Sequence, residues 1–172
     1  MKIIKIRKNK EIPFLYHHPW IFSGALENDK KANAKDGEEI KEIDYQDKFI
    51  GWGLYNSKSQ IRIRLYSFIE AEVLEEGYWC GLIEKAINMR EKTLSEEAFS
   101  NACRLIFSEA DNLSGLVVDR FGECLSVQFT SLALYHRKDV IITHLIKLLS
   151  PQAIYLRTEK GMADEEGLEI KD

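Results

Sequence analysis

Cysteine, proline and long apolar runs are scarce in this 172-residue chain. Its three cysteines, 23 and 21 residues apart, include no C-x-x-C pair, which argues against a disulfide framework or a zinc site and is typical of a reducing cytoplasm. The longest uncharged run, residues 12–26, contains two prolines and is shorter than the about 20 apolar residues of a membrane-spanning helix. Residues 1–10 alternate basic residues with isoleucine, so they lack the apolar core of a signal peptide.

Charge is distributed unevenly along the chain, whose formal net charge is -4. Residues 1–70 carry 13 basic and 10 acidic side chains, a net of +3, whereas residues 71–172 carry 11 and 18, a net of -7. An acidic whole argues against a general nucleic-acid binder, but the basic first part leaves a local electrostatic site open. With 45% hydrophobic and 30% charged residues, the composition excludes the disordered and fibrous classes.

Strands are predicted in the first 70 residues because apolar and polar side chains alternate there with a period of two. Closely spaced strands with one apolar face indicate a small β-barrel, with a turn between the last two strands and a polar loop ahead of the second. The predicted strands are 2–7, 38–43, 48–55 and 60–66. The turn is 56–59 and the polar loop is 28–37.

Helical periodicity appears after residue 74 and predicts an α+β module. The predicted helices are 77–95 and 134–149. The predicted strands are 105–107, 116–119, 124–129 and 153–157. The polar stretch 159–172 shows no periodicity, and we expect it to be loose. The change of period predicts two modules, 1–70 and 71–172, with separate cores, and predicts that a fragment of residues 72–158 unfolds cooperatively on its own.

An aromatic run with two histidines, HHPWIFSGA at residues 17–25, is the most distinctive motif. Pro19 fixes its own φ and holds His18 extended. Adjacent side chains of an extended segment point to opposite faces, which argues against a metal shared by the two histidines. The aromatic residues of the run either anchor the barrel core or leave His18 exposed beside a nucleic acid; the frequency with which large aromatics are buried favours the core.

Two arginines, Arg62 and Arg64, lie on one face of a predicted strand, about 7 Å apart. That spacing resembles successive phosphates on one nucleic-acid strand, and the arginine fork matches phosphate oxygens. The alternative is a solvated strand face on which they pair with carboxylates of neighbouring strands. Alternation points both away from the apolar core, so we expect an exposed face that includes Arg62 and Arg64.

Three carboxylates, Glu109, Asp111 and Asp119, lie within eleven residues and raise the question of an acid/base pair or a metal site. Turn chemistry explains them better, because Asp-Asn before a glycine is typical of a tight turn. None of the cysteines, Cys80, Cys103 and Cys124, has a convincing partner to activate a thiolate, although Cys103 precedes Arg104, so we expect small buried residues there. The chain contains no G-x-G-x-x-G loop, P-loop or H-x-E motif.

Together these motifs resemble one family, the S-adenosylmethionine-dependent cytosine-5 methyltransferases of bacterial large-subunit ribosomal RNA. H-P-W-I-F-S-G-A at 18–25 and G-x-G-x-Y-N-x-x-S-Q-I-R-x-R at 51–64 look like the family's PUA domain. E-A-D-x-L-x-G-L-x-V-D-R at 109–120, I-Y-x-R at 154–157 and E-G-L at 166–168 look like its central α+β domain.

The chain departs from the family pattern in several places. His17 stands where the family has an arginine, and Asn112 and Ser114 replace a glycine and a proline of the central turn. The family also has an Asp after I-Y-x-R and an Arg before E-G-L, and neither is matched. The family's Rossmann-like methyltransferase domain, with its glycine-rich cofactor loop and nucleophilic cysteine, is not visible, so we expect it to be absent from this chain.

The resemblance implies the RNA-recognition and positioning part of such a methyltransferase. We expect structured RNA of the 23S type as partner, no membrane, and a cytoplasmic location; the oligomeric state stays open, a homodimer included. S-adenosylmethionine is the cofactor of the full-length family enzyme, and we expect neither cofactor binding nor methyl transfer by this chain alone. The residues expected to contact RNA are Lys8, His18, Lys58, Arg62 and Arg64.

Two other functions remain open on the sequence alone. The chain could be a stand-alone RNA-binding or assembly module, or a protein-interaction module whose acidic second half binds a basic partner such as a ribosomal protein. A reading frame that continues past residue 172 into a glycine-rich loop would favour the enzyme, and a pull-down with and without ribonuclease would separate RNA binding from protein binding.

Overall fold

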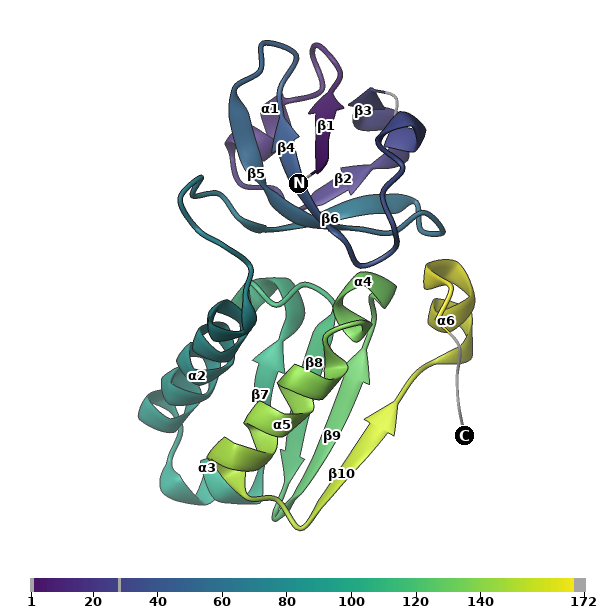
Figure 1. Ribbon diagram of the computed structural model, residues 1–172. Helices are drawn as coiled ribbons and strands as arrows, with labels where there is room; N and C mark the ends of the chain where they lie inside the picture. Colours follow the sequence, from purple (N-terminus) through teal and green to yellow (C-terminus); the bar gives the residue numbers. More distant parts are fainter. Residues whose placement is uncertain (1, 28, 169–172) are drawn as a thin grey trace.

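Figure 1 shows the computed structural model, in which a β-barrel-like module packs on a second module of helices and strands. The structure describes residues 2–27 and 29–168. None of the helices in these residues combines the length and the apolar composition that a bilayer-spanning segment needs. Dividing the chain at residue 70 stays a prediction; the last barrel strand ends at Ser67 and the first long helix begins at Glu76.

The first module is a six-stranded sheet in the order β2-β6-β5-β4-β1-β3, in which β1 and β4 pair in parallel and all other neighbours are antiparallel. The four strands predicted from alternation are confirmed, while the short β2, β3 and α1 were not predicted. Its strands and helices are β1 Lys2–Ile6, α1 Ile12–Leu15, β2 Trp20–Phe22, η1 Ser23–Ala25, β3 Leu26–Glu27, η2 Asp29–Ala32, β4 Glu39–Ile43, β5 Phe49–Tyr55 and β6 Ile61–Ser67.

The second module is a four-stranded sheet in the order β10-β9-β8-β7, with α2 and α5 on one face (Figure 1). β9 and β10 pair in parallel across the α4–α5 connection, a β-α-β crossover of the kind that builds Rossmann-like sheets. Its elements are α2 Glu76–Thr93, α3 Glu96–Asn101, β7 Ala102–Phe107, η3 Ser108–Asp111, β8 Leu116–Phe121, β9 Cys124–Phe129, α4 Leu132–Tyr135, α5 Lys138–Leu149, β10 Ala153–Arg157 and α6 Lys160–Glu166.

Two expectations for the second module are wrong. The helix predicted over 134–149 is broken into α4 and α5 at His136–Arg137. The stretch 159–172 was expected to be loose, but residues 160–166 form α6, and residues 169–172 lie outside the described part. α6 has no apolar period of its own; Glu166, Ala163 and the following Leu168 are buried by contacts with the rest of the chain, which no local pattern reveals.

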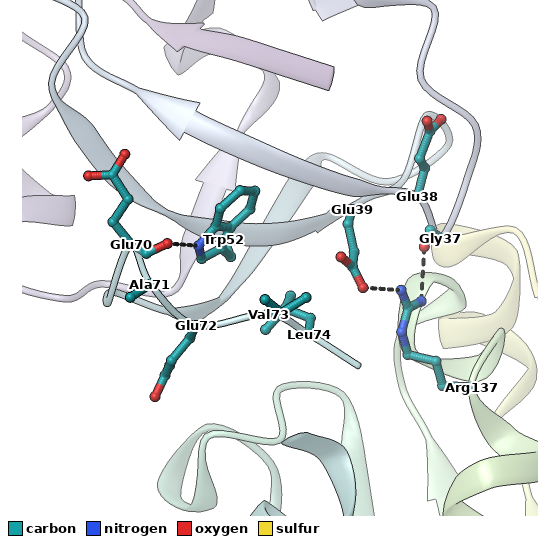
Figure 2. Close-up of a pocket in the computed structure, with 10 residues that line it drawn as sticks. All are labelled: Gly37, Glu38, Glu39, Trp52, Glu70, Ala71, Glu72, Val73, Leu74 and Arg137. Atoms are coloured by element: carbon teal, nitrogen blue, oxygen red, sulfur yellow. Dashed lines mark hydrogen bonds and ion pairs between the residues drawn. The ribbon is translucent and has the colours of Figure 1, made fainter. Parts of the chain in front are cut away.

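The linker after β6 runs along the barrel and encloses a cavity of about 650 Å³ with it (Figure 2). The Trp52 indole Nε1 donates to the Glu70 carbonyl at 3.2 Å. Across the cavity, Arg137 of the second module donates to the Gly37 carbonyl at 2.9 Å and lies 3.5 Å from the Glu39 carboxylate. The cavity is therefore bordered by contacts that join the two modules.

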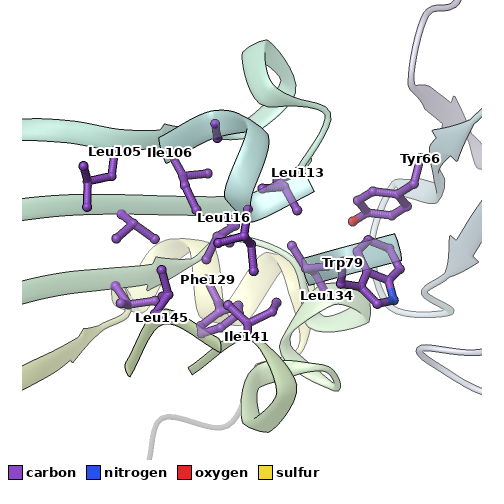
Figure 3. Close-up of a cluster of buried hydrophobic side chains, with 14 of the residues drawn as sticks. Tyr66, Trp79, Leu105, Ile106, Leu113, Leu116, Phe129, Leu134, Ile141 and Leu145 are labelled. Carbon is purple, nitrogen blue, oxygen red and sulfur yellow. The ribbon is translucent and has the colours of Figure 1, made fainter. Parts of the chain in front are cut away.

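In the described residues, the two larger hydrophobic clusters do not divide at the residue where the two modules do. The core of the second module includes Leu54 and Tyr66 from the barrel strands, and the Tyr66 ring packs edge-on against Trp79 at 5.0 Å (Figure 3). The Tyr66 hydroxyl donates to the Ser114 carbonyl at 2.6 Å. The outer face of β5 and β6 is thus covered by the second module instead of facing water.

Glu42 is the one carboxylate that the barrel buries completely, among the residues described. It lies on β4 opposite Ile4 and Gly51, is 0% exposed, and neither carboxyl oxygen has a hydrogen-bond partner in the described part of the chain. Burial raises the pKa of Glu42 well above its ordinary value. The carboxyl is therefore neutral in the fold over a pH range in which the unfolded chain ionises it.

This burial predicts a pH-dependent gain of stability on replacement. Because the pKa of Glu42 is raised in the folded state, its contribution to the free energy of unfolding is most favourable below its pKa in the unfolded chain. That contribution is lost as the pH rises toward its pKa in the folded chain. Glu42→Met should stabilise the chain by about 1–3 kcal/mol at pH 7, because it removes an unpaired buried polar group, and by less at pH 4. Urea unfolding at both pH values measures this; an equal gain at both, or a loss at pH 7, contradicts it.

Candidate functional site

A groove of about 710 Å³ lies where β2, the β5–β6 turn, η3 and α6 meet. It brings together residues from several sequence motifs, namely Trp20, Lys58, Arg64 and Glu109. Trp20 is half-buried and Phe22 is 48% exposed, so aromatic surface remains accessible on β2. This groove is the place where the two most distinctive sequence runs meet.

The Trp20 side chain connects the barrel to the second module. Its indole Nε1 donates to Glu109 Oε1 at 2.8 Å, and the Arg64 guanidinium lies 5.7 Å from its ring. Burial opposes ionisation of Glu109, but hydrogen bonds from Ser114, Ser108 and Trp20 outweigh it and lower its pKa. Trp20 therefore acts as more than a core anchor: its polar edge holds a carboxylate of the neighbouring module.

Arg64 is buried, and the expectation that it shares an exposed face with Arg62 is wrong. Arg64 is 6% exposed; its Nη2 lies 3.0 Å from Glu166 Oε1 and its Nη1 donates to Ser114 Oγ at 3.2 Å. Alternation along β6 correctly pointed Arg64 away from the barrel core. The second module covers that side of the strand, so the guanidinium pairs with carboxylates instead of meeting solvent.

Glu166 of α6 is the acceptor around which this junction is built. Besides Arg64, its carboxylate accepts from Ser59 Oγ at 2.7 Å and from Asn56 Nδ2 at 3.0 Å, and it is 5% exposed. Sequence reasoning missed Glu166 as a site residue, since it lies in a stretch without periodicity. The E-G-L run at 166–168 was the only signal, and it gives no role for the carboxylate.

Arg62 is also engaged by the chain itself. Its Nε lies 3.2 Å from Asp29 Oδ2, and its Nη1 donates to the carbonyls of Asn56, at 3.1 Å, and Ser57. Pairing with carboxylates, the alternative left open by the sequence, therefore describes both arginines. The partner of Arg62 comes from η2, not from the strand carboxylates that the sequence suggested.

The three remaining residues expected to contact RNA are exposed, but they lie in different places. His18 accepts from the Trp20 backbone N–H at 3.2 Å and lies edge-on to the Trp20 ring at 6.0 Å, beside the groove. Lys58 lines the groove from the β5–β6 turn, its stem against Gly167. Lys8 lies over the Tyr45 ring at 5.7 Å, in the β1–α1 loop, and is not among the groove residues.

The carboxylates Asp111 and Asp119, outside the groove, form ion pairs within the chain, and two of the cysteines are not activated. Asp111 pairs with both Nη atoms of Arg90, at 2.5 and 2.8 Å, and Asp119 pairs with Arg104 at 2.7 Å, which agrees with the structural interpretation. Burial raises the pKa of the Cys80 and Cys103 thiols, so neither is an activated nucleophile. In residues 2–27 and 29–168, no three or more His, Cys, Asp or Glu side chains lie together as the ligands of a metal ion would.

The junction predicts a large loss of stability when its carboxylate is removed. Glu166→Ala leaves the buried Arg64 without its closest anion, which should destabilise the chain by about 3 kcal/mol or more. Glu165→Ala, a change of an exposed neighbour on the same helix, should cost no more than about 0.5 kcal/mol. Urea unfolding measures both. Equal, small effects would show that the ion pair contributes nothing to the junction.

Comparisons with known proteins find one matching family model and a set of similar proteins. Residues 4–68 match a family model described as a PUA-like domain. Over 165 residues the chain is 33% identical to a ribosomal RNA large subunit methyltransferase I from Escherichia coli and to another from Shigella flexneri, a match that covers 96% of this chain. The chain spans about two fifths of the length of these relatives, 41% in each case.

Two solved structures share the fold at low identity. A methyltransferase complexed with SAH covers 94% of this chain with a TM-score of 0.77 and 15% sequence identity. A SAM-dependent methyltransferase from Streptococcus mutans covers 92% of this chain with a TM-score of 0.76 and 14% sequence identity. The chain covers 41% of each. The expectation of an α+β fold from which a Rossmann-like methyltransferase domain is absent is therefore wrong: the second sheet, with its β9–α5–β10 crossover, lies within the fold that these methyltransferases share. By sequence, the chain is similar over 96% of its length to part of the ribosomal RNA large subunit methyltransferases, and residues 4–68 are similar to a PUA-like domain.

Proposed function

We propose that this chain recognises and positions RNA for S-adenosylmethionine-dependent methylation of large-subunit ribosomal RNA. The observation that carries the proposal is the 33% identity to ribosomal RNA large subunit methyltransferases over 96% of the chain. The methylated atom, C5 of a cytosine, and the 23S-type RNA follow from the motif resemblance alone and are part of the proposal, as is a cytoplasmic location.

The barrel side of the groove at the module junction supports RNA contact, whereas its α6 side carries the carboxylates of Asp164 and Glu165. Lys58 at its rim provides a cation for phosphate, while Trp20 and Phe22 provide aromatic surface and His18 lies alongside. Lys8 would contact RNA at a second place on the barrel. Arg62 and Arg64 are engaged by Asp29 and Glu166, so Arg64 acts on RNA only indirectly, by holding the groove walls together.

S-adenosylmethionine is the methyl donor implied for this family, and one structural neighbour was solved with SAH. In Rossmann-like sheets such a ligand lies at the carboxyl ends of parallel strands, beside a glycine-rich loop. After β9 this position is occupied by Thr130 and Ser131, and Ser131 Cβ packs tightly against Gly115. These residues do not fit the cofactor, so we derive no methyl-transfer step from them.

A protein-interaction role is the second candidate, and the net charge of -7 in residues 71–172 favours it. A basic ribosomal protein would be the fitting partner. Pull-downs with and without ribonuclease separate the two functions: partners lost on ribonuclease treatment support RNA recognition, and partners retained support protein binding.

RNA recognition through the lysines predicts a change in the salt dependence of binding. Lys58→Ala and Lys8→Ala should each weaken binding to a structured ribosomal RNA fragment and lower the slope of log K against log salt by about one unit per lost phosphate contact. Lys85→Ala, an exposed lysine on α2, is the matched control and should leave the slope unchanged. Fluorescence anisotropy at several salt concentrations gives the slopes. Unchanged slopes in both barrel variants would refute contact through these lysines.

A further inference from the structure

One face of the second sheet is uncovered in the described part of the chain. Strand register places Arg104, Phe107, Asp119, Phe121, Tyr155 and Arg157 on this open face. None of these side chains is buried, whereas residues of the opposite face, such as Val118 and Val127, are fully buried under α2 and α5. Figure 1 shows both long helices on that opposite face.

Three large aromatic rings stand on the open face. Phe107 is 50%, Phe121 60% and Tyr155 63% exposed. They come from β7, β8 and β10, and Phe121 and Tyr155 lie two strands apart, about 10 Å across the sheet. Polar side chains such as Ser126 and Gln128 lie between the rings on this face, so the three rings are separate aromatic platforms and not one continuous apolar patch.

The charge of the open face differs from that of its module. Arg104 lies 4.9 Å from the Phe107 ring and is held there by two hydrogen bonds to Asp119, at 2.7 and 3.0 Å. Arg157 is exposed at the end of β10. Two arginines and one aspartate give the face a net charge of +1, against -7 for residues 71–172. The face is thus the part of an acidic module that suits a polyanion.

We propose that the open face binds single-stranded RNA, with bases stacked on Phe107, Phe121 and Tyr155 and a phosphate at Arg157. Every base offers a π-face, so exposed rings on a sheet hold unpaired nucleotides with little sequence preference. This inference rests on the proposed function, RNA recognition, and adds a second surface to the groove. The occupant is an unpaired segment, whereas the lysines of the barrel contact structured RNA.

Binding of an unstructured 12-nucleotide RNA to the full 172-residue chain tests the proposal. Phe121→Ala and Tyr155→Ala should each weaken binding about fivefold or more, since removing a stacking ring costs at least that factor. In these two variants the slope of log K against log salt should stay unchanged, whereas Arg157→Ala should lower that slope by about 0.7. Ile146→Ala is the matched control, because Ile146 is 50% exposed on α5, away from the open face.

A second measurement keeps the test independent of how the variants fold. Photo-crosslinking of the unaltered chain with 4-thiouridine RNA, followed by peptide mapping, should place crosslinks in β7, β8 or β10. Full single-strand affinity in the Phe121→Ala/Tyr155→Ala double variant, or crosslinks confined to the barrel, overturns the open-face proposal and leaves the groove intact. If neither the 12-nucleotide RNA nor a ribosomal hairpin binds, the proposed function itself fails. A face that docks protein instead would give no crosslinks and would equally overturn the proposal.

Discussion

The buried pairing of Arg64 with Glu166 is the constraint on which the junction of the two modules depends. A guanidinium and a carboxylate that are 6% and 5% exposed are stable only while each satisfies the other, because an isolated buried charge is costly. Ser59, Asn56 and Ser114 add further hydrogen bonds, while Nε of Arg64 has no hydrogen-bond partner among the described residues. The barrel strand, the η3–β8 turn and α6 are thereby held in one arrangement.

This arrangement determines which surfaces are left for a partner. Packing of the second module on β5 and β6 removes Tyr66 and Arg64 from the surface and leaves Trp20, Phe22 and Lys58 along the groove. The helices cover one side of the second sheet and leave the open face on the other. Both candidate RNA surfaces therefore depend on contacts made elsewhere, and a change at the junction would affect the groove before it affected the open face.

Local pattern predicted the elements better than it predicted their surroundings. The alternation of apolar and polar residues predicted β4, β5 and β6. It also correctly predicted that Arg62 and Arg64 lie on the opposite face of the strand from Ile63 and Leu65. It could not show that another module covers that side of β6, because burial between modules leaves no period in the sequence. The turn interpretation is correct for Asp111 and Asn112 at the end of η3, whereas Asp119 lies within β8. The acceptor role of Glu109 depends on Trp20, 89 residues earlier.

Equilibrium unfolding followed separately in each module tests the coupling most directly. Two of the three tryptophans, Trp20 and Trp52, lie in the barrel and Trp79 lies in α2, so 5-fluorotryptophan labelling gives each module its own ¹⁹F signal. If the buried ion pair and the shared core join the modules, all three signals should lose their native intensity at one urea midpoint. Barrel and α2 signals that disappear at clearly different midpoints would contradict the account and restore the view of two independently folding cores.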